Sequence, residues 1–194
     1  MIRSPKFWYK NNLISQIFVP ISFIWIFIDF LKRKFSHPYK SKLKIICVGN
    51  VNVGGSGKTP LCIHLFRHLK ELNFNPIFLS SGYGGENLGP VIVNKYKEIN
   101  FFGDESILLS KHGPTIVSKN RYKGIKLIEK EFGEHDIVIM DDGLQNYELY
   151  KDLNLLAIDR KMLFGNQRCL PAGPLRQTIK TCMKQIDAII FTGN

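Results

Sequence analysis

Short apolar, largely β-branched runs alternate with longer segments of helical periodicity from residue 43 onward. The apolar runs predict strands at residues 43–48, 76–80, 114–118, 136–140, 153–158 and 186–191. The periodic segments predict helices at residues 58–72, 104–112, 120–132 and 176–185. Strands that alternate with helices favour a mostly parallel sheet flanked by helices, so the predicted fold class is α/β.

The first 42 residues follow a different pattern, because Ile17–Ile28 is interrupted only by Pro20 and Ser22. With its apolar neighbours the run approaches the ~20 residues that a membrane span needs. Gln16, Pro20 and Asp29 weaken that interpretation. A helix in the membrane plane fits better, and a helix packed on the body of the protein stays open. A cleaved signal peptide is disfavoured because no small-residue cleavage site follows.

Charge separates the same two parts of the chain. The net charge is +11, and residues 1–44 hold nine Lys and Arg against one acid, whereas the remainder holds 18 bases and 15 acids. A nearly neutral body argues against a nucleic-acid partner, and a basic arm favours an anionic membrane surface. We therefore predict an N-terminal membrane-associating arm, residues 1–42, and a second domain, residues 43–194. The four cysteines form no C-x-x-C pair, which favours a reducing, cytosolic compartment.

A glycine-rich segment directly follows the first predicted strand. Residues 54–59 read Gly-Gly-Ser-Gly-Lys-Thr, the end of a phosphate-binding P-loop. In such a loop Lys58 places a cation on the β- and γ-phosphates, and the Thr59 hydroxyl can hold Mg²⁺. The usual first glycine is replaced by Asn52, a residue that tolerates left-handed backbone better than most.

Two carboxylates end another predicted strand, in the sequence Asp136-Ile-Val-Ile-Met-Asp141-Asp142-Gly143. Ligands gather at the carboxyl ends of parallel strands, so these acids are expected to meet the P-loop there and to hold Mg²⁺. The simpler alternative for Asp142 is a turn residue before the glycine.

Two further segments have both a structural and a functional interpretation. Asp104 and Glu105 open a predicted helix, where acids are common as caps or first-turn residues, but they could also serve as a base or metal ligands. Arg176 ends the rigid segment Leu170-Pro-Ala-Gly-Pro-Leu-Arg176. It is either a solvated charge or a group that stabilises phosphoryl charge.

Taken together, these segments resemble the tetraacyldisaccharide 4′-kinase (lipid A 4′-kinase) family. The matching stretches are Val48–Pro60, Gly82–Gly85, Gly103–Glu105, Asp141–Gln145 and Leu170–Arg176. They occur in the family's order across nearly the whole chain, and the family also usually lacks the first P-loop glycine.

The resemblance implies that the second domain is a P-loop kinase domain. It also implies that the protein is a lipid kinase, which uses ATP and Mg²⁺ to phosphorylate the 4′-hydroxyl of a tetraacyldisaccharide monophosphate. The resemblance places this reaction on the lipid-A disaccharide precursor at the cytoplasmic face of the bacterial inner membrane. The phosphate-binding residues would be Asn52, Val53, Gly54, Gly55, Ser56, Gly57, Lys58 and Thr59. The metal site would use Thr59, Glu105, Asp141 and Asp142. The catalytic groups would be Asp104, Lys58, Asp141 and Arg176.

The chain departs from the family pattern in three ways. Ser81 stands where the family has arginine, and Gln177 stands where it usually has an acid. The family also continues into a C-terminal portion that supplies a partner histidine for Asp104, so we expect a truncated member. The alternative function is therefore a membrane-attached nucleotide-binding protein without transferase activity. A P-loop GTPase is disfavoured, since no guanine-reading segment follows Asp142.

Overall fold

The protein is described by a computed structural model that covers residues 5–10, 12–86, 88–93 and 99–193. Arg3, one of the basic residues of the predicted arm, lies outside the described residues. The contacts within the protein divide the chain into two compact units. We call residues 37–49 and 58–154 the sheet unit, and residues 1–36, 50–57 and 155–194 the arm unit. The division into domains at residue 42 stays a prediction.

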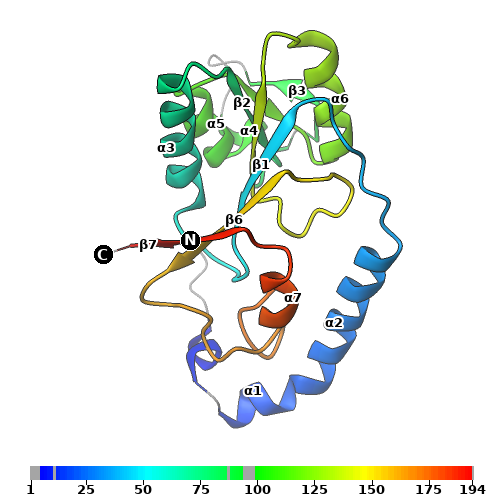
Figure 1. Cartoon of the computed structure of the whole chain (residues 1–194). Helices are drawn as coiled ribbons and strands as arrows, with labels where there is room; N and C mark the ends of the chain where they lie inside the picture. Colours follow the sequence, from blue (N-terminus) through cyan, green and yellow to red (C-terminus); the bar gives the residue numbers. More distant parts are fainter. Residues whose placement is uncertain (1–4, 11, 87, 94–98, 194) are drawn as a thin grey trace. The chain divides into compact units, whose positions relative to one another are not determined.

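The described part of the sheet unit holds strands β1 to β5 and the start of β6 (Figure 1). The first five are β1 (Lys44–Gly49), β2 (Pro76–Ser80), β3 (Val91–Ile92), β4 (Thr115–Val117) and β5 (Ile137–Asp141). Their order is β3-β4-β2-β5-β1, and every pair is parallel except β3 with β4. The predicted mostly parallel α/β sheet is therefore confirmed. The two-residue strand β3 was not predicted.

Helices cover both faces of this sheet, and α3 and α6 lie on opposite sides of it (Figure 1). The helices are α3 (Lys58–Glu71), α4 (Ile99–Phe102), α5 (Asp104–Ser110) and α6 (Arg121–Glu131). Side chains alternate along β2: Phe78 stacks on Phe66 of α3 at 4.6 Å between ring centroids, while Ile77 and Leu79 join a cluster with Ile125 of α6. Because β2 and β5 are buried along their whole length, they form the rigid centre of the unit.

The arm unit contains the first and last elements of the chain. They are η1 (Lys6–Tyr9), α1 (Leu13–Ile17), α2 (Val19–Lys34), α7 (Ile179–Met183), β7 (Ala188–Thr192) and most of β6 (Leu153–Asp159). Strands β6 and β7 pair in parallel. The apolar run that predicted one helix forms two, because α1 ends at Ile17 and α2 begins at Val19 with a proline in its first turn.

Within the arm unit, the helices α1 and α2 are attached to the C-terminal segment through polar groups. Ser15 Oγ donates to the carbonyl of Ala172, and Ser22 Oγ donates to the carbonyl of Cys169, each at 2.8 Å. Trp25 Nε1 donates to the carbonyl of Arg176 at 2.7 Å. Thus the segment around Leu170–Arg176 is the docking partner of the N-terminal helices.

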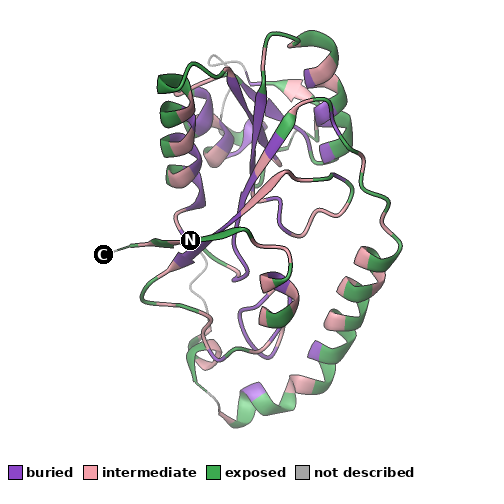
Figure 2. Cartoon of the chain, in the orientation of Figure 1, coloured by how far each residue is buried: buried purple, intermediate pink, exposed green. Residues whose placement is uncertain are grey.

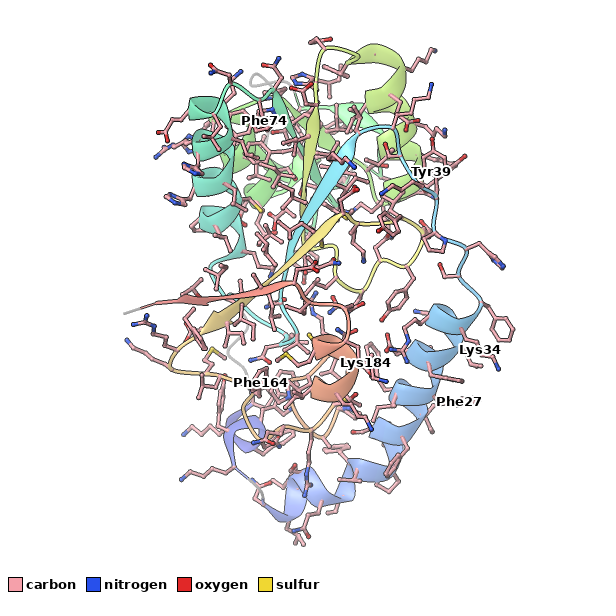
Figure 3. All side chains as sticks on the ribbon, in the orientation of Figure 1. Phe27, Lys34, Tyr39, Phe74, Phe164 and Lys184 are labelled. Carbon is pink, nitrogen blue, oxygen red and sulfur yellow. The ribbon has the colours of Figure 1, made fainter. Side chains whose placement is uncertain are left out.

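The apolar side chains of these helices face outward. Figure 2 shows α1 and α2 mostly as exposed, and their buried residues are the serines Ser15 and Ser22. The exposed apolar residues are Leu13, Ile14, Ile17, Ile21, Phe23, Ile24, Trp25, Phe27, Ile28 and Phe30. Phe27 and Lys34 project from α2 in Figure 3. Across the described ranges, no helix combines the length and the apolar character needed to cross a membrane.

Candidate functional site

The carboxyl edge of the sheet unit brings the P-loop strand and the acidic strand together. Strands β1 and β5 are parallel neighbours, and Val48 pairs in register with Asp141. The chain after β1 and the carboxylates after β5 therefore leave the sheet at the same edge. This is where an open parallel sheet binds ligands.

Lys58 and Thr59 form the first turn of α3, and both are buried. The Thr59 hydroxyl donates a hydrogen bond of 3.1 Å to Oδ2 of Asp141. Since a helix N-terminus carries partial positive charge, this position also favours an anion. The structure thus brings together Lys58, Thr59 and Asp141, as their motifs predict.

The environment of Asp141 strongly affects its protonation. Burial raises the pKa of Asp141 to about 6, and the negative charge of Glu105 adds to the rise. The positive charge of Lys58 and the hydrogen bond from Thr59 act in the opposite direction. This carboxyl is therefore costly to ionise until a cation joins it.

One oxygen of this carboxyl is available to such a cation. Oδ1 of Asp141 is buried and has no hydrogen-bond partner among the described residues. The Thr59 hydroxyl bonds to this carboxyl, and the charges of the Glu105 and Asp142 carboxylates act on it. Within the described ranges, no three His, Cys, Asp or Glu side chains form a cluster that could hold a metal ion by themselves. Hard oxygen ligands beside a bound triphosphate are what Mg²⁺ prefers, so the residues present fit this ion.

Asp104 and Glu105 occupy the first turn of α5. Gly103, with φ of +79°, takes the N-cap position, and no side chain caps this helix end. A β-carbon at Gly103 would collide with the carbonyl of Tyr83, so the glycine lets the loop around Tyr83 approach the two acids. Asp104 is exposed and Glu105 is half-buried, which leaves Asp104 the more accessible carboxylate.

The glycine-rich part of the P-loop, residues 50–57, belongs to the arm unit. Gly54 and Gly57 adopt positive φ values of 123° and 71°. The Val53 amide donates to the carbonyl of Pro174 at 2.8 Å, and the Arg176 amide donates to the carbonyl of Val51 at 2.7 Å. The backbone of Arg176 thus supports the loop, while the proposed role of its side chain stays a prediction.

Asn52 does not adopt the left-handed backbone conformation that was expected to compensate for the missing glycine. Asn52 is absent from the described residues with positive φ and instead forms an antiparallel bridge with Leu175. Its side-chain amide donates to the carbonyl of Leu163. The loop therefore starts as a short extended pair, a conformation that needs no glycine.

Two cations near the acidic strand end were missed by the sequence analysis. Arg121 begins α6 and is buried, and its guanidinium donates to the carbonyl of Asp141 at 2.6 Å. Lys151 Nζ donates to the carbonyl of Asn146 at 2.7 Å. Both side chains donate to backbone carbonyls, and no motif spacing signals such contacts.

The strand order, the loop after β1 and the contact between Thr59 and Asp141 together define a P-loop nucleotide-binding class of protein. The family model of the tetraacyldisaccharide-1-P 4′-kinases, LpxK, matches residues 14–194. The chain therefore belongs to the LpxK family, which confirms the resemblance drawn from its motifs.

Individual relatives agree with this assignment. A tetraacyldisaccharide 4′-kinase of Rickettsia bellii is 39% identical over 190 residues, which cover 98% of this chain and 59% of the relative. The same-named protein of Francisella tularensis subsp. novicida is 40% identical, over 97% of this chain and 61% of the relative. The crystal structure of "apo" form LpxK from Aquifex aeolicus in complex with ATP gives a TM-score of 0.81 at 32% identity, covering 93% of this chain and 59% of that one. The chain thus spans about three fifths of the length of these relatives.

Proposed function

We propose that this chain carries the nucleotide-binding part of an ATP-dependent kinase that phosphorylates the 4′-hydroxyl of a tetraacyldisaccharide monophosphate in lipid A biosynthesis. The observation that carries the proposal is the buried contact between Thr59 and Asp141 beside Lys58, with one carboxylate oxygen left unpaired. The ATP complex of the Aquifex aeolicus relative supports ATP as the phosphoryl donor.

At the donor end of the reaction, Lys58 would bind the β- and γ-phosphates of ATP, and the backbone amides of residues 52–57 would surround them. Thr59, Glu105, Asp141 and Asp142 would hold Mg²⁺. When bound, Mg²⁺ would neutralise negative charge on the phosphate oxygens. These groups position the nucleotide and leave little covalent chemistry to the protein.

At the acceptor end, the γ-phosphoryl group moves from ATP to the sugar 4′-oxygen and ADP leaves. The carboxylate of Asp104, exposed at the start of α5, would accept the proton of that hydroxyl. Arg176 would stabilise phosphoryl charge. Because an alcohol is a weak nucleophile, holding it in line with the phosphorus supplies most of the acceleration.

The proposal is tested by incubating the chain with ATP labelled in the γ-phosphate and tetraacyldisaccharide monophosphate. Label in the lipid fraction is expected, and omission of the lipid is the control. ATP binding without labelled lipid would favour the alternative, a nucleotide-binding protein without transferase activity. Absence of ATP binding would contradict the P-loop assignment itself.

We also propose that α1 and α2 lie in the plane of an anionic membrane, at the cytoplasmic face of the inner membrane. Their buried residues are serines and their exposed residues are predominantly apolar, the reverse of a helix packed on a core. Lys32, Arg33 and Lys34 in the last turn of α2 supply positive charge beside this surface. An apolar helix face with basic neighbours is typical of interfacial helices.

This arrangement predicts that Phe23→Ser combined with Phe27→Ser releases the protein from vesicles of anionic phospholipid. Two exposed aromatic rings contribute several kcal/mol of apolar burial, about 1.5–3 kcal/mol each. Sedimentation with vesicles measures the effect. The matched control is Phe74→Ser, an exposed phenylalanine of the sheet unit. Equal release by the double variant and the control would contradict membrane docking through α2.

A further inference from the structure

The turn that follows β5 contains an unusual backbone conformation at one candidate metal ligand. Asp142 adopts a φ of +57°, in the left-handed region that non-glycine residues seldom occupy. Such conformations persist where neighbouring contacts hold them. Side chains from two other parts of the chain hold the backbone on either side of Asp142.

The carbonyl before Asp142 is held by Arg121. The Nη2 of this buried arginine donates to the carbonyl of Asp141 at 2.6 Å, and its Nη1 donates to the carbonyl of Ser118 at 3.4 Å. The charge of Arg121 also acts favourably on the Asp141 and Asp142 carboxylates. Arg121 therefore joins the end of β5 to the start of α6.

The carbonyls after Asp142 are held by Lys151. Its Nζ donates to the carbonyls of Gly143 at 3.2 Å, Leu144 at 3.3 Å and Asn146 at 2.7 Å. An ammonium group has three N–H donors, and here all three are used on one turn. Arg121 therefore holds the carbonyl that precedes Asp142, and Lys151 holds carbonyls that follow it.

Packing leaves this turn little freedom to move. A β-carbon on Gly143 would collide with the Met140 side chain, and Leu144 packs so closely on Gly49 that a β-carbon there would also collide. The Asp142 amide donates to the carbonyl of Val48 at 2.9 Å, which joins the turn to β1. The backbone of Asp142 is therefore fixed from three directions.

We propose that Arg121 and Lys151 are positioning residues that fix the backbone from which Asp141 and Asp142 present their carboxylates to the divalent metal. The inference rests on the proposed function, since it concerns the same site. Neither cation needs to touch metal or nucleotide, because both act through the carbonyls on either side of Asp142. Their positive charge also offsets the repulsion between two adjacent carboxylates.

The inference is tested by metal binding in the variant Lys151→Met, which keeps the side-chain length and removes all three donors. Binding of Mn²⁺ in the presence of ATP is measured by electron paramagnetic resonance, and binding of ATP alone by titration. We expect Mn²⁺ affinity to fall about 10-fold or more, as for other groups that orient metal ligands. ATP affinity without metal is expected to change less than about twofold, and Lys151→Arg to recover part of the Mn²⁺ affinity.

The matched control is Lys44→Met, because Lys44 is exposed and pairs with Asp152 away from the turn. Arg121→Lys, which keeps the charge at the buried position, should also weaken Mn²⁺ binding and leave binding of ATP alone intact. Thermal unfolding of each variant establishes that measurements are made on folded protein.

The outcomes separate the inference from the proposed function. If wild-type protein binds Mn²⁺ with ATP and folded Lys151→Met binds it equally well, the positioning role is overturned alone. If Lys151→Met weakens ATP binding as much as Mn²⁺ binding, a general structural role replaces it. If wild-type protein binds neither ATP nor Mn²⁺, the proposed function falls and the inference falls with it.

Discussion

Lys58→Met is expected to lower phosphate transfer about 10²–10³-fold, the loss typical of removing one preorganised charge-stabilising group. ATP affinity should also fall about tenfold or more, because a charge-assisted hydrogen bond contributes roughly 1.5–3 kcal/mol. Lys58 is buried at the start of α3, where no other side chain of the P-loop carries a positive charge. Titration with ATP and the labelled-phosphate assay measure the two effects.

The matched control for this variant is Lys70→Met in the same helix. Lys70 is exposed in the last turn of α3 and donates to Asn75, so its loss should leave ATP binding unchanged. If Lys58→Met bound ATP with wild-type affinity, the proposed role of the P-loop in binding ATP would be contradicted.

Asp141→Asn is expected to stabilise the metal-free protein while it removes metal-dependent activity. Burial and the charge of Glu105 raise the pKa of Asp141 to about 6, whereas an unfolded aspartate titrates near 3.9. The folded state thus binds this proton more tightly than the unfolded state, and ionisation opposes folding above pH 6. Two pKa units correspond to about 3 kcal/mol, which asparagine, a neutral mimic of the protonated acid, should recover.

Urea unfolding without metal, repeated between pH 4 and pH 8, measures this gain. The gain should be full above pH 6, shrink as pH falls from 6 to 4, and vanish near pH 4. Asp152→Asn is the control, and its effect on stability should have the opposite sign. Burial acts to raise the pKa of Asp152, but hydrogen bonds from Lys40 and the Ile45 amide hold this pKa below its usual value. An Asp141→Asn protein less stable than wild type at pH 8 would contradict the argument.

The sheet was predictable because its strands are buried on both faces. Nearly continuous apolar runs such as Pro76–Ser80 and Ile137–Asp141 distinguish central parallel strands, and the boundaries predicted for these strands differ from the observed ones by at most one residue. Strand β3 was missed because two residues carry no periodicity. The contact between Thr59 and Asp141 follows from strand order once both motifs are placed on neighbouring strands.

Other features depend on contacts that a local pattern does not encode. The predicted helix at 176–185 is shorter, since α7 begins at Ile179 after Thr178 caps it, and Arg176 pairs with Val51. Arg121 and Lys151 act on backbone carbonyls, which every residue possesses, so their targets leave no signature in the sequence. Asn52 was expected to imitate a glycine, but bridging to Leu175 made that unnecessary.

The attachment of α1 and α2 through Ser15 and Ser22 also determines how the protein behaves outside its natural setting. In plain aqueous buffer the outward phenylalanines and isoleucines of these helices have no apolar phase to enter, so copies of the chain should associate through them as concentration rises. Detergent micelles would cover the same face and keep the chains apart. We therefore expect the choice of detergent to decide whether a purified sample consists of single chains, and kinetic measurements without detergent to be made on associated chains.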